Sequence, residues 1–123
     1  MQKTGVRGIY LGNYIRWDTK AQHEKMIALY DYYTGPLART FDRYNDVDDL
    51  HFTGAHDVIK LRKHGYSRAT DDACREIRYG RLSREEALGL VRHYENRPVS
   101  DWPALERMVG LNRQDILALV DRH

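Results

Sequence analysis

The stretch from Lys60 to Arg84 carries the side chains best suited to binding an anion. It holds eight basic residues against three acidic ones, a local net charge of +5. Arginine presents a planar fork of donors that fits phosphate oxygens, and tyrosine presents a flat face to a ring. The pattern indicates a phosphate-bearing ligand. We expect its contacts to come from Tyr66, Arg68, Asp71, Arg75 and Arg78.

An alternative interpretation assigns the same charges to an ion-paired helix surface. Asp71 and Arg75 lie four residues apart, which is the spacing of neighbours along one helical face. Such a pair contributes only about 0.2–0.5 kcal/mol to helix stability. The segment would then be a solvated face that binds no ligand, and the residues alone leave both interpretations open.

The other residues that could take part in catalysis do not form a recognisable catalytic motif. The sequence lacks a glycine-rich phosphate loop, a Gly-x-Ser-x-Gly turn, a His-Glu-x-x-His helix and a Cys-x-x-Cys pair. His51 and His56 are five residues apart and do not share a helical face, so no metal site is predicted. Arg75 and Arg78 could favour a thiolate at Cys74, but a small buried cysteine is far commoner and is expected here.

Length and composition favour one soluble domain over residues 1–123. The chain has 123 residues, 41% of them hydrophobic, and a net charge of +2. One cysteine cannot form an internal disulfide, and no apolar run approaches the roughly 20 residues that span a bilayer. We therefore expect a cytoplasmic protein, and the small net charge does not by itself indicate nucleic acid.

The elements that must position these residues begin with a strand or extended arm over residues 1–17. The sequence from Gly8 to Ile15 is rich in aromatic and β-branched residues, and a strand there would need a partner for its backbone groups. Asp18 can cap a helix that runs to Tyr30. The apolar stripe of this helix is expected to consist of Met26, Leu29, Tyr30 and Tyr33.

The segment from Pro36 to Thr53 predicts a loop with an acidic rim. Its acidic residues are Asp42, Asp46, Asp48 and Asp49, opposed by Arg39 and Arg43.

A helix is predicted from Ala55 to His64, with Gly65 as its C-terminal cap. Another is predicted after Thr70, whose hydroxyl can cap its first turn, and it ends at Gly80.

Three further helices follow. Ser83 and Glu86 form a capping-box pattern before a helix that ends near Asn96. Asp101 can cap a short helix with Pro103 in its first turn, and Asn112 can cap the last one. The fold class is therefore mainly α, with about six short helices in an orthogonal or irregular bundle.

The last three helices also permit a helix-turn-helix interpretation. Their short lengths and the turn at Gly110 are compatible with that motif. However, Asp115 and Asp121 would face phosphates unfavourably, so DNA binding is not favoured.

Two stretches resemble one protein family. They are LGNYIRWD, residues Leu11 to Asp18, and HGYSRATDDACREIRYGRLSREEALGLVRHYE, residues His64 to Glu95. Both are similar to the C-terminal part of the N-acetyl sugar amidotransferases of bacterial surface-polysaccharide biosynthesis, which include lipopolysaccharide O-antigen and pseudaminic or legionaminic acid enzymes. Positions outside the longer stretch also match the family, and we expect them to be secondary site residues: Tyr14, Trp17, Asp18, His56 and Asp57.

The resemblance implies an ATP-dependent enzyme that adenylates the acetamido carbonyl of a nucleotide-linked sugar and replaces its oxygen with ammonia. A separate glutaminase would supply the ammonia. The family's Ser-Gly-Gly-x-Asp-Ser type loop for ATP is not found in this sequence, and neither is its N-terminal cysteine cluster. We therefore expect no cofactor on this chain and no catalysis by it alone.

Several roles remain compatible with this resemblance. The chain could bind a nucleotide sugar beside a partner that carries the ATP loop, with Arg68, Arg75 and Arg78 on anionic oxygens, Asp71 on an arginine or sugar hydroxyl and Tyr66 as an aromatic wall. It could instead be a helical module that only docks another protein. A homodimer formed through the N-terminal strand is a further expectation.

Overall fold

A computed structural model describes residues 5, 7–43 and 51–122 of the chain. The chain divides into two compact units, Met1–Tyr33 and Thr34–His123. The described residues form a mainly α fold, as predicted, with no strand. The elements are a 3-10 helix η1 (Leu11–Asn13) and six α-helices, α1 (Thr19–Tyr30), α2 (Thr53–His64), α3 (Arg68–Arg78), α4 (Arg84–Glu95), α5 (Trp102–Val109) and α6 (Arg113–Val120).

The described residues from Gly8 to Ile15 contain no strand, so of the two alternatives predicted for residues 1–17, a strand or an extended arm, the strand is wrong. The backbone groups here bond locally instead: the Asn13 amide donates to the Tyr10 carbonyl at 3.0 Å, and the Tyr14 amide donates to that of Leu11 at 2.9 Å. These bonds form the turn η1. A segment without a neighbouring strand satisfies its donors most readily by turning back on itself.

Helix α1 begins as the sequence predicts. The Asp18 side chain accepts a hydrogen bond from the Ala21 amide at 3.4 Å. The expected apolar stripe, however, is not buried: Leu29 and Tyr30 are 59% and 70% exposed, and α1 buries no residue. The first unit therefore presents its large apolar side chains on its surface.

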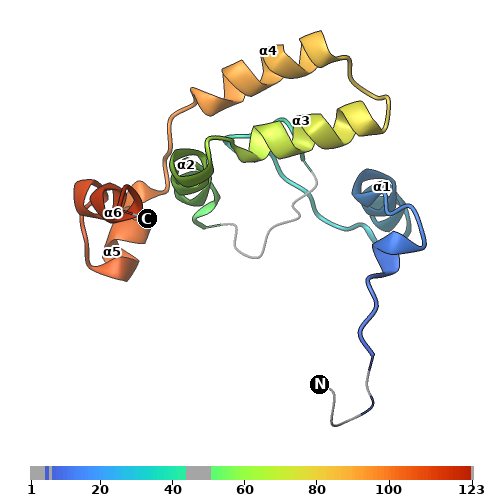
Figure 1. Cartoon of the computed structure of the whole chain (residues 1–123), viewed down its shortest axis with the longest axis horizontal. Coiled ribbons are helices and arrows are strands. Elements are labelled where there is room, and N and C mark those ends of the chain that lie inside the picture. The colour runs from blue at the N-terminus through green and yellow to red at the C-terminus, as the bar shows by residue number, and fades with distance from the viewer. Residues whose placement is uncertain (1–4, 6, 44–50, 123) are drawn as a thin grey trace. The chain divides into compact units, whose positions relative to one another are not determined.

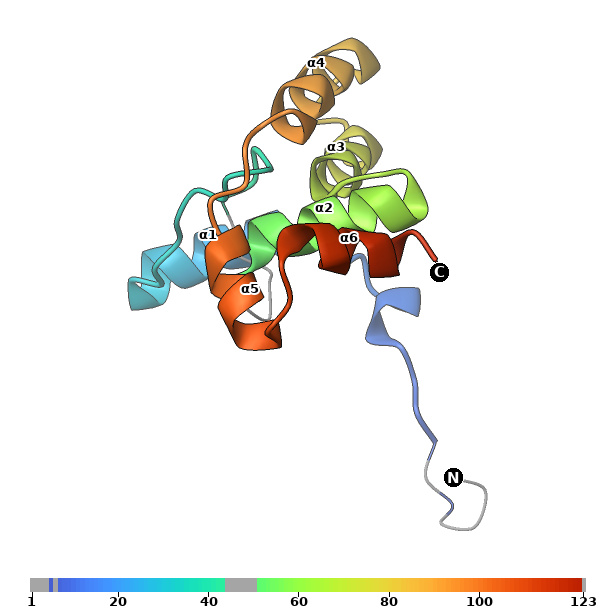
Figure 2. The same cartoon turned by 90° about the vertical axis from the view of Figure 1, so that its left-hand side faces the viewer.

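Helices α3 and α4 lie side by side in the second unit, as both views show (Figures 1 and 2). Small side chains at Ala69, Ala73 and Ala87 are buried in these helices. Ser83 and Glu86 form the predicted capping box at the start of α4. At the start of α3 the prediction was wrong, because Ser67 rather than Thr70 accepts the capping hydrogen bond.

Helix α2 packs against α5 and α6, and it runs across the direction of α3 and α4 (Figure 1). The buried apolar cluster here consists of Ala55, Trp102 and Ile116. Gly65 and Gly110 end α2 and α5 in the left-handed conformation, at φ of 77° and 74°. Asn112 caps α6, as predicted.

Asp101 does not cap the helix that follows it, which corrects the sequence prediction. Its carboxylate instead accepts hydrogen bonds from the amides of Gly54 at 2.7 Å and Ala55 at 2.9 Å, in the first turn of α2. A side chain at residue 54 would meet the Asp101 oxygens at 3.1 Å, so glycine suits this close approach. Among the helices of the described residues, none is long and apolar enough to cross a membrane.

Candidate functional site

The predicted ligand-binding residues of α3 lie on two different faces of the helix. Asp71 and Arg78 are exposed, seven residues apart, with Cys74 exposed between them. Arg68 and Arg75, also seven residues apart, are partly buried beside the fully buried Asp72. The difference in exposure between these two sets therefore divides α3 into an outer polar face and an inner ionic face. The exposure of Cys74 contradicts the expectation of a buried cysteine.

Asp72 is the centre of the inner face. It accepts a hydrogen bond from the Thr40 hydroxyl at 2.6 Å. Arg75 Nη1 lies 3.2 Å from one of its oxygens, and Arg68 Nε lies 3.7 Å from the other. Burial raises the pKa of Asp72, although the hydrogen bond from Thr40 opposes this effect. The carboxylate therefore ties α3 to the loop that precedes α2.

Arg75 lies among three carboxylates. It contacts Asp42, Asp72 and Glu76, the last at 3.3 Å. Burial alone would lower the pKa of Arg75, but the hydrogen bond with Asp42 and the charge of Asp72 outweigh it, and the pKa is raised. In this arrangement the Arg75 fork serves internal ion pairs.

Asp42 is buried, which corrects its placement on an acidic rim. The other rim residues, Asp46, Asp48 and Asp49, lie outside the described residues. Glu76 is buried as well and is held by Arg81 through bonds of 2.6 and 2.8 Å. The hydrogen bond from Arg81 lowers the pKa of Glu76.

Asp57 is the centre of a second buried network. Its carboxylate accepts a hydrogen bond of 2.7 Å from Arg39 Nε and one of 2.6 Å from the Arg68 amide at the start of α3. Arg39 also donates to the carbonyls of Arg97 at 2.5 Å and Glu95 at 2.9 Å. One arginine thus joins the loop, α2 and the end of α4.

The secondary candidate His56 is exposed, unlike its neighbour Asp57.

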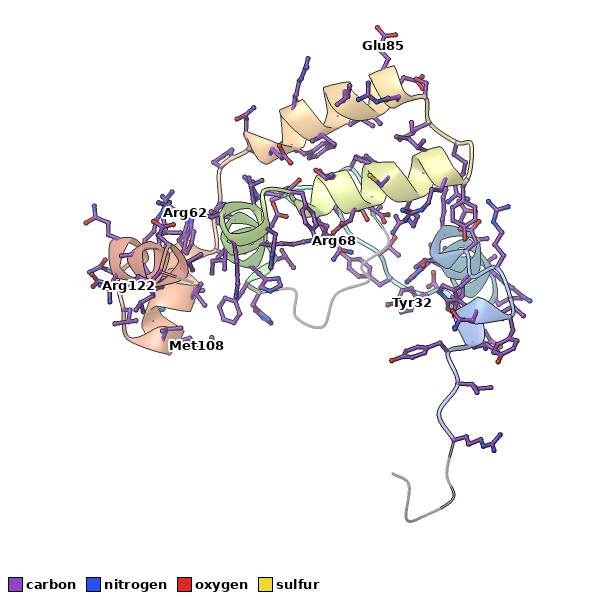
Figure 3. All side chains as sticks on the ribbon, viewed as in Figure 1. Tyr32, Arg62, Arg68, Glu85, Met108 and Arg122 are labelled. Atoms are coloured by element: carbon purple, nitrogen blue, oxygen red, sulfur yellow. The ribbon has the colours of Figure 1, made fainter. Side chains whose placement is uncertain are left out.

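A third polar contact joins the start of α3 to the end of α4, where Glu95 accepts hydrogen bonds from the hydroxyls of Ser67 at 2.7 Å and Thr70 at 3.0 Å. Figure 3 labels Arg68 at this end of α3. The start of α3 is therefore held by two carboxylates, Asp57 and Glu95.

Tyr66 and Asp71 are brought together on the surface by a lysine of α2. The Nζ atom of Lys60 contacts the Asp71 carboxylate and lies 4.8 Å from the centre of the Tyr66 ring. Tyr66 is 42% exposed, and the Asp71 side chain is 51% exposed. We call these three residues the Lys60 cluster. It combines a cation, an aromatic ring and an anion within reach of solvent.

Three secondary candidates belong to the first unit. Tyr14 and Trp17 are 73% and 53% exposed, and Asp18 caps α1. The other predicted site residues all belong to the second unit. Within the described residues, no group of three or more histidine, cysteine, aspartate or glutamate side chains is arranged for a metal ion.

Sequence reasoning did not find Arg39, Thr40 or Glu95 as partners of the predicted site residues. Arg39 lies 18 residues from Asp57 and 58 from Arg97, so no helical or strand spacing links them. Thr40 and Asp72 are 32 residues apart.

A family model described as LPS biosynthesis protein WbpG-like, C-terminal domain, matches residues 38–123. The chain belongs to this family. The match confirms the resemblance of the stretch from His64 to Glu95, and it connects the chain with lipopolysaccharide biosynthesis. The stretch from Leu11 to Asp18 lies outside the matched residues. It covers both buried networks and the Lys60 cluster, while the first unit, Met1–Tyr33, precedes it. No curated protein matches the chain.

Proposed function

We propose that the chain is the nucleotide-sugar-binding helical portion of an ATP-dependent N-acetyl sugar amidotransferase and is not catalytic alone. Its substrate would be a nucleotide-linked sugar on the path to lipopolysaccharide O-antigen. The observation that carries the proposal is the exposed edge formed by Tyr66, Asp71 and Arg78, beside Lys60. This edge belongs to the family domain over residues 38–123.

The two faces of α3 have different roles in this proposal. The inner face binds α3 to the loop before α2, because Arg75 contacts Asp42 and Asp72 accepts a hydrogen bond from Thr40. Arg68 pairs with Asp72 within the helix. The outer face offers Arg78 and the Lys60 cluster to solvent. Guanidinium and ammonium groups suit phosphate oxygens, and a tyrosine ring suits the face of a sugar or base. We therefore assign ligand contact to the outer face and positioning to the inner face.

The chemical step requires residues that this chain does not supply. Adenylation of an acetamido oxygen needs a cradle for ATP phosphates, and the sequence has no glycine-rich loop of that kind. A protein that carries the ATP loop, together with a glutaminase subunit, would complete the reaction. In this proposal no cofactor is bound by the present chain.

The direct test is a titration of the isotope-labelled full chain with UDP-N-acetylglucosamine, followed by amide NMR. We expect shifts concentrated between Lys60 and Arg81, with saturation. Shifts confined to other segments, or none at millimolar ligand, would contradict the proposal. UMP and free N-acetylglucosamine, titrated separately, report which half of the ligand is recognised.

A second candidate function is that of a protein-docking module without a small ligand. It is favoured by the apolar surface of the first unit, where Tyr10, Leu29, Tyr30 and Tyr33 are each more than half exposed. Tyrosine and tryptophan are enriched at the centres of protein interfaces. Co-purification of the full chain with a protein that carries an ATP loop would support docking. The same result for a variant with these residues changed to serine would contradict it.

A further inference from the structure

Lys60 connects the two exposed members of the predicted site, although the sequence placed it only in the surrounding basic segment. It comes from α2, whereas Asp71 comes from the first turn of α3 and Tyr66 from the turn between these helices. Its ammonium group contacts the Asp71 carboxylate and lies 4.8 Å from the centre of the Tyr66 ring. A single cation is thus shared between an anion and an aromatic face.

This ion pair differs from the buried ones in its access to water. The side chains of Arg39 and Asp57 are only 5% and 2% exposed, and both make further hydrogen bonds. In the Lys60–Asp71 pair the values are 25% and 51%. An anion from solvent can therefore replace the Asp71 carboxylate on Lys60 without opening the fold, whereas it cannot do so at Arg39.

We infer that Lys60 is a phosphate-binding residue and that Asp71 holds its ammonium group in place until the ligand arrives. The ligand class is a sugar or nucleoside that carries a diphosphate, because a ring is needed beside Tyr66 and an anion on Lys60. This inference rests on the proposed nucleotide-sugar function and names the cation that recognises the diphosphate.

The exchange is physically reasonable on charge grounds. A diphosphate carries more negative charge than one carboxylate, and its oxygens can accept several of the three ammonium hydrogens. Asp71 lies in the first turn of α3, at the positive end of the helix dipole, so its charge stays stabilised after Lys60 turns to the ligand. Asp71 then stands beside the bound phosphate as a like charge, which weakens binding.

Substitution of Lys60 and substitution of Asp71 should therefore change the affinity for the ligand in opposite directions. Inorganic pyrophosphate and UDP-N-acetylglucosamine are titrated by calorimetry into the wild-type chain, Lys60→Met and Asp71→Asn. We expect Lys60→Met to weaken both ligands by about tenfold, the value of one charge-assisted hydrogen bond. Asp71→Asn should tighten both by roughly threefold, because it removes a like charge near the phosphate. Lys63→Met removes the same charge from an exposed position of the same helix and should change the affinity much less.

The outcomes separate this inference from the function on which it rests. If Lys60→Met and Asp71→Asn weaken binding equally, the pair only joins α2 to α3 and the inference is overturned. If the Lys60→Met variant binds both ligands as tightly as the wild type, the inference fails. The proposed function still stands in that case, provided that the amide NMR shifts of the wild-type chain fall between Lys60 and Arg81. If the wild-type chain binds neither ligand, both fail. Thermal unfolding of each variant shows that the compared proteins are folded.

Discussion

Substitution of Arg39 by methionine should destabilise the second unit more than any surface change. Arg39 donates to Asp57 Oδ2 at 2.7 Å and to the carbonyls of Glu95 and Arg97. The Arg39→Met variant keeps a long apolar stem but removes all three hydrogen bonds. It leaves the Asp57 carboxylate buried, with the Arg68 amide at 2.6 Å as its remaining described donor.

The size of the effect follows from burial. Removing one partner of a buried ion pair costs about 3–5 kcal/mol, because the other charge remains out of water. A unit spanning residues 34–123 has a total stability of roughly 4–13 kcal/mol at about 0.05–0.15 kcal/mol per residue. The loss is thus a large share of the total. The free energy of unfolding falls by about 2 kcal/mol for each molar of urea, so a loss of about 4 kcal/mol lowers the urea midpoint by roughly 2 M.

The assay is urea unfolding followed by circular dichroism and tryptophan fluorescence. Trp102 is buried in the second unit and reports on its core. Asp57→Asn keeps an oxygen for the Arg68 amide, so its midpoint should fall between those of Arg39→Met and the wild type. Arg62→Met is the matched control, because Arg62, labelled in Figure 3, lies on the exposed surface. Its ion pair with Asp121 is exposed, so its loss should leave the midpoint nearly unchanged. An equal midpoint for Arg39→Met and Arg62→Met would refute the reasoning.

Three further predictions concern single residues. The hydrogen bond from Arg81 lowers the pKa of Glu76 below its ordinary 4.5, so this stabilisation is present above pH 4.5 and is lost as the pH falls through the lowered pKa. Glu76→Gln should therefore be less stable than the wild type at pH 7, with a difference in urea midpoint that shrinks below pH 4.5. Asp101→Ala should cost about 1–2 kcal/mol and speed amide exchange at Gly54 and Ala55, because it removes the cap of α2. Cys74 is exposed, so one equivalent of Ellman's reagent should react with the native chain nearly as fast as with the chain in urea.

Each of these predictions has a contradicting result. A Glu76→Gln difference that is constant from pH 7 to pH 3 would show that Arg81 does not act through the charge. Unchanged exchange at Gly54 in Asp101→Ala would show that the cap is not needed. A Cys74 that reacts only after unfolding would contradict its exposure.

The helices were accessible to sequence reasoning because their signals are local. Asp18, Ser83 and Asn112 cap the helices predicted for them, since a capping side chain reaches an amide only two or three residues away. Two predicted caps were wrong. Ser67 rather than Thr70 caps α3, and Asp101 binds the first turn of α2 instead of the helix that follows it. Capping residues identify helix starts, but competing partners decide which amide each one binds.

The sequence by itself determined the mainly α class, the helix starts at Asp18, Ser83 and Asn112, and the family, because each rests on neighbouring residues or on a continuous motif. Only the tertiary structure decided how the basic segment is used. Folding brings Arg75 to the buried Asp42 and leaves Asp71 on the surface with Lys60. Those two pairings join residues 33 and 11 positions apart. No spacing rule links residues at such separations, because the path of the intervening loops sets which charges meet.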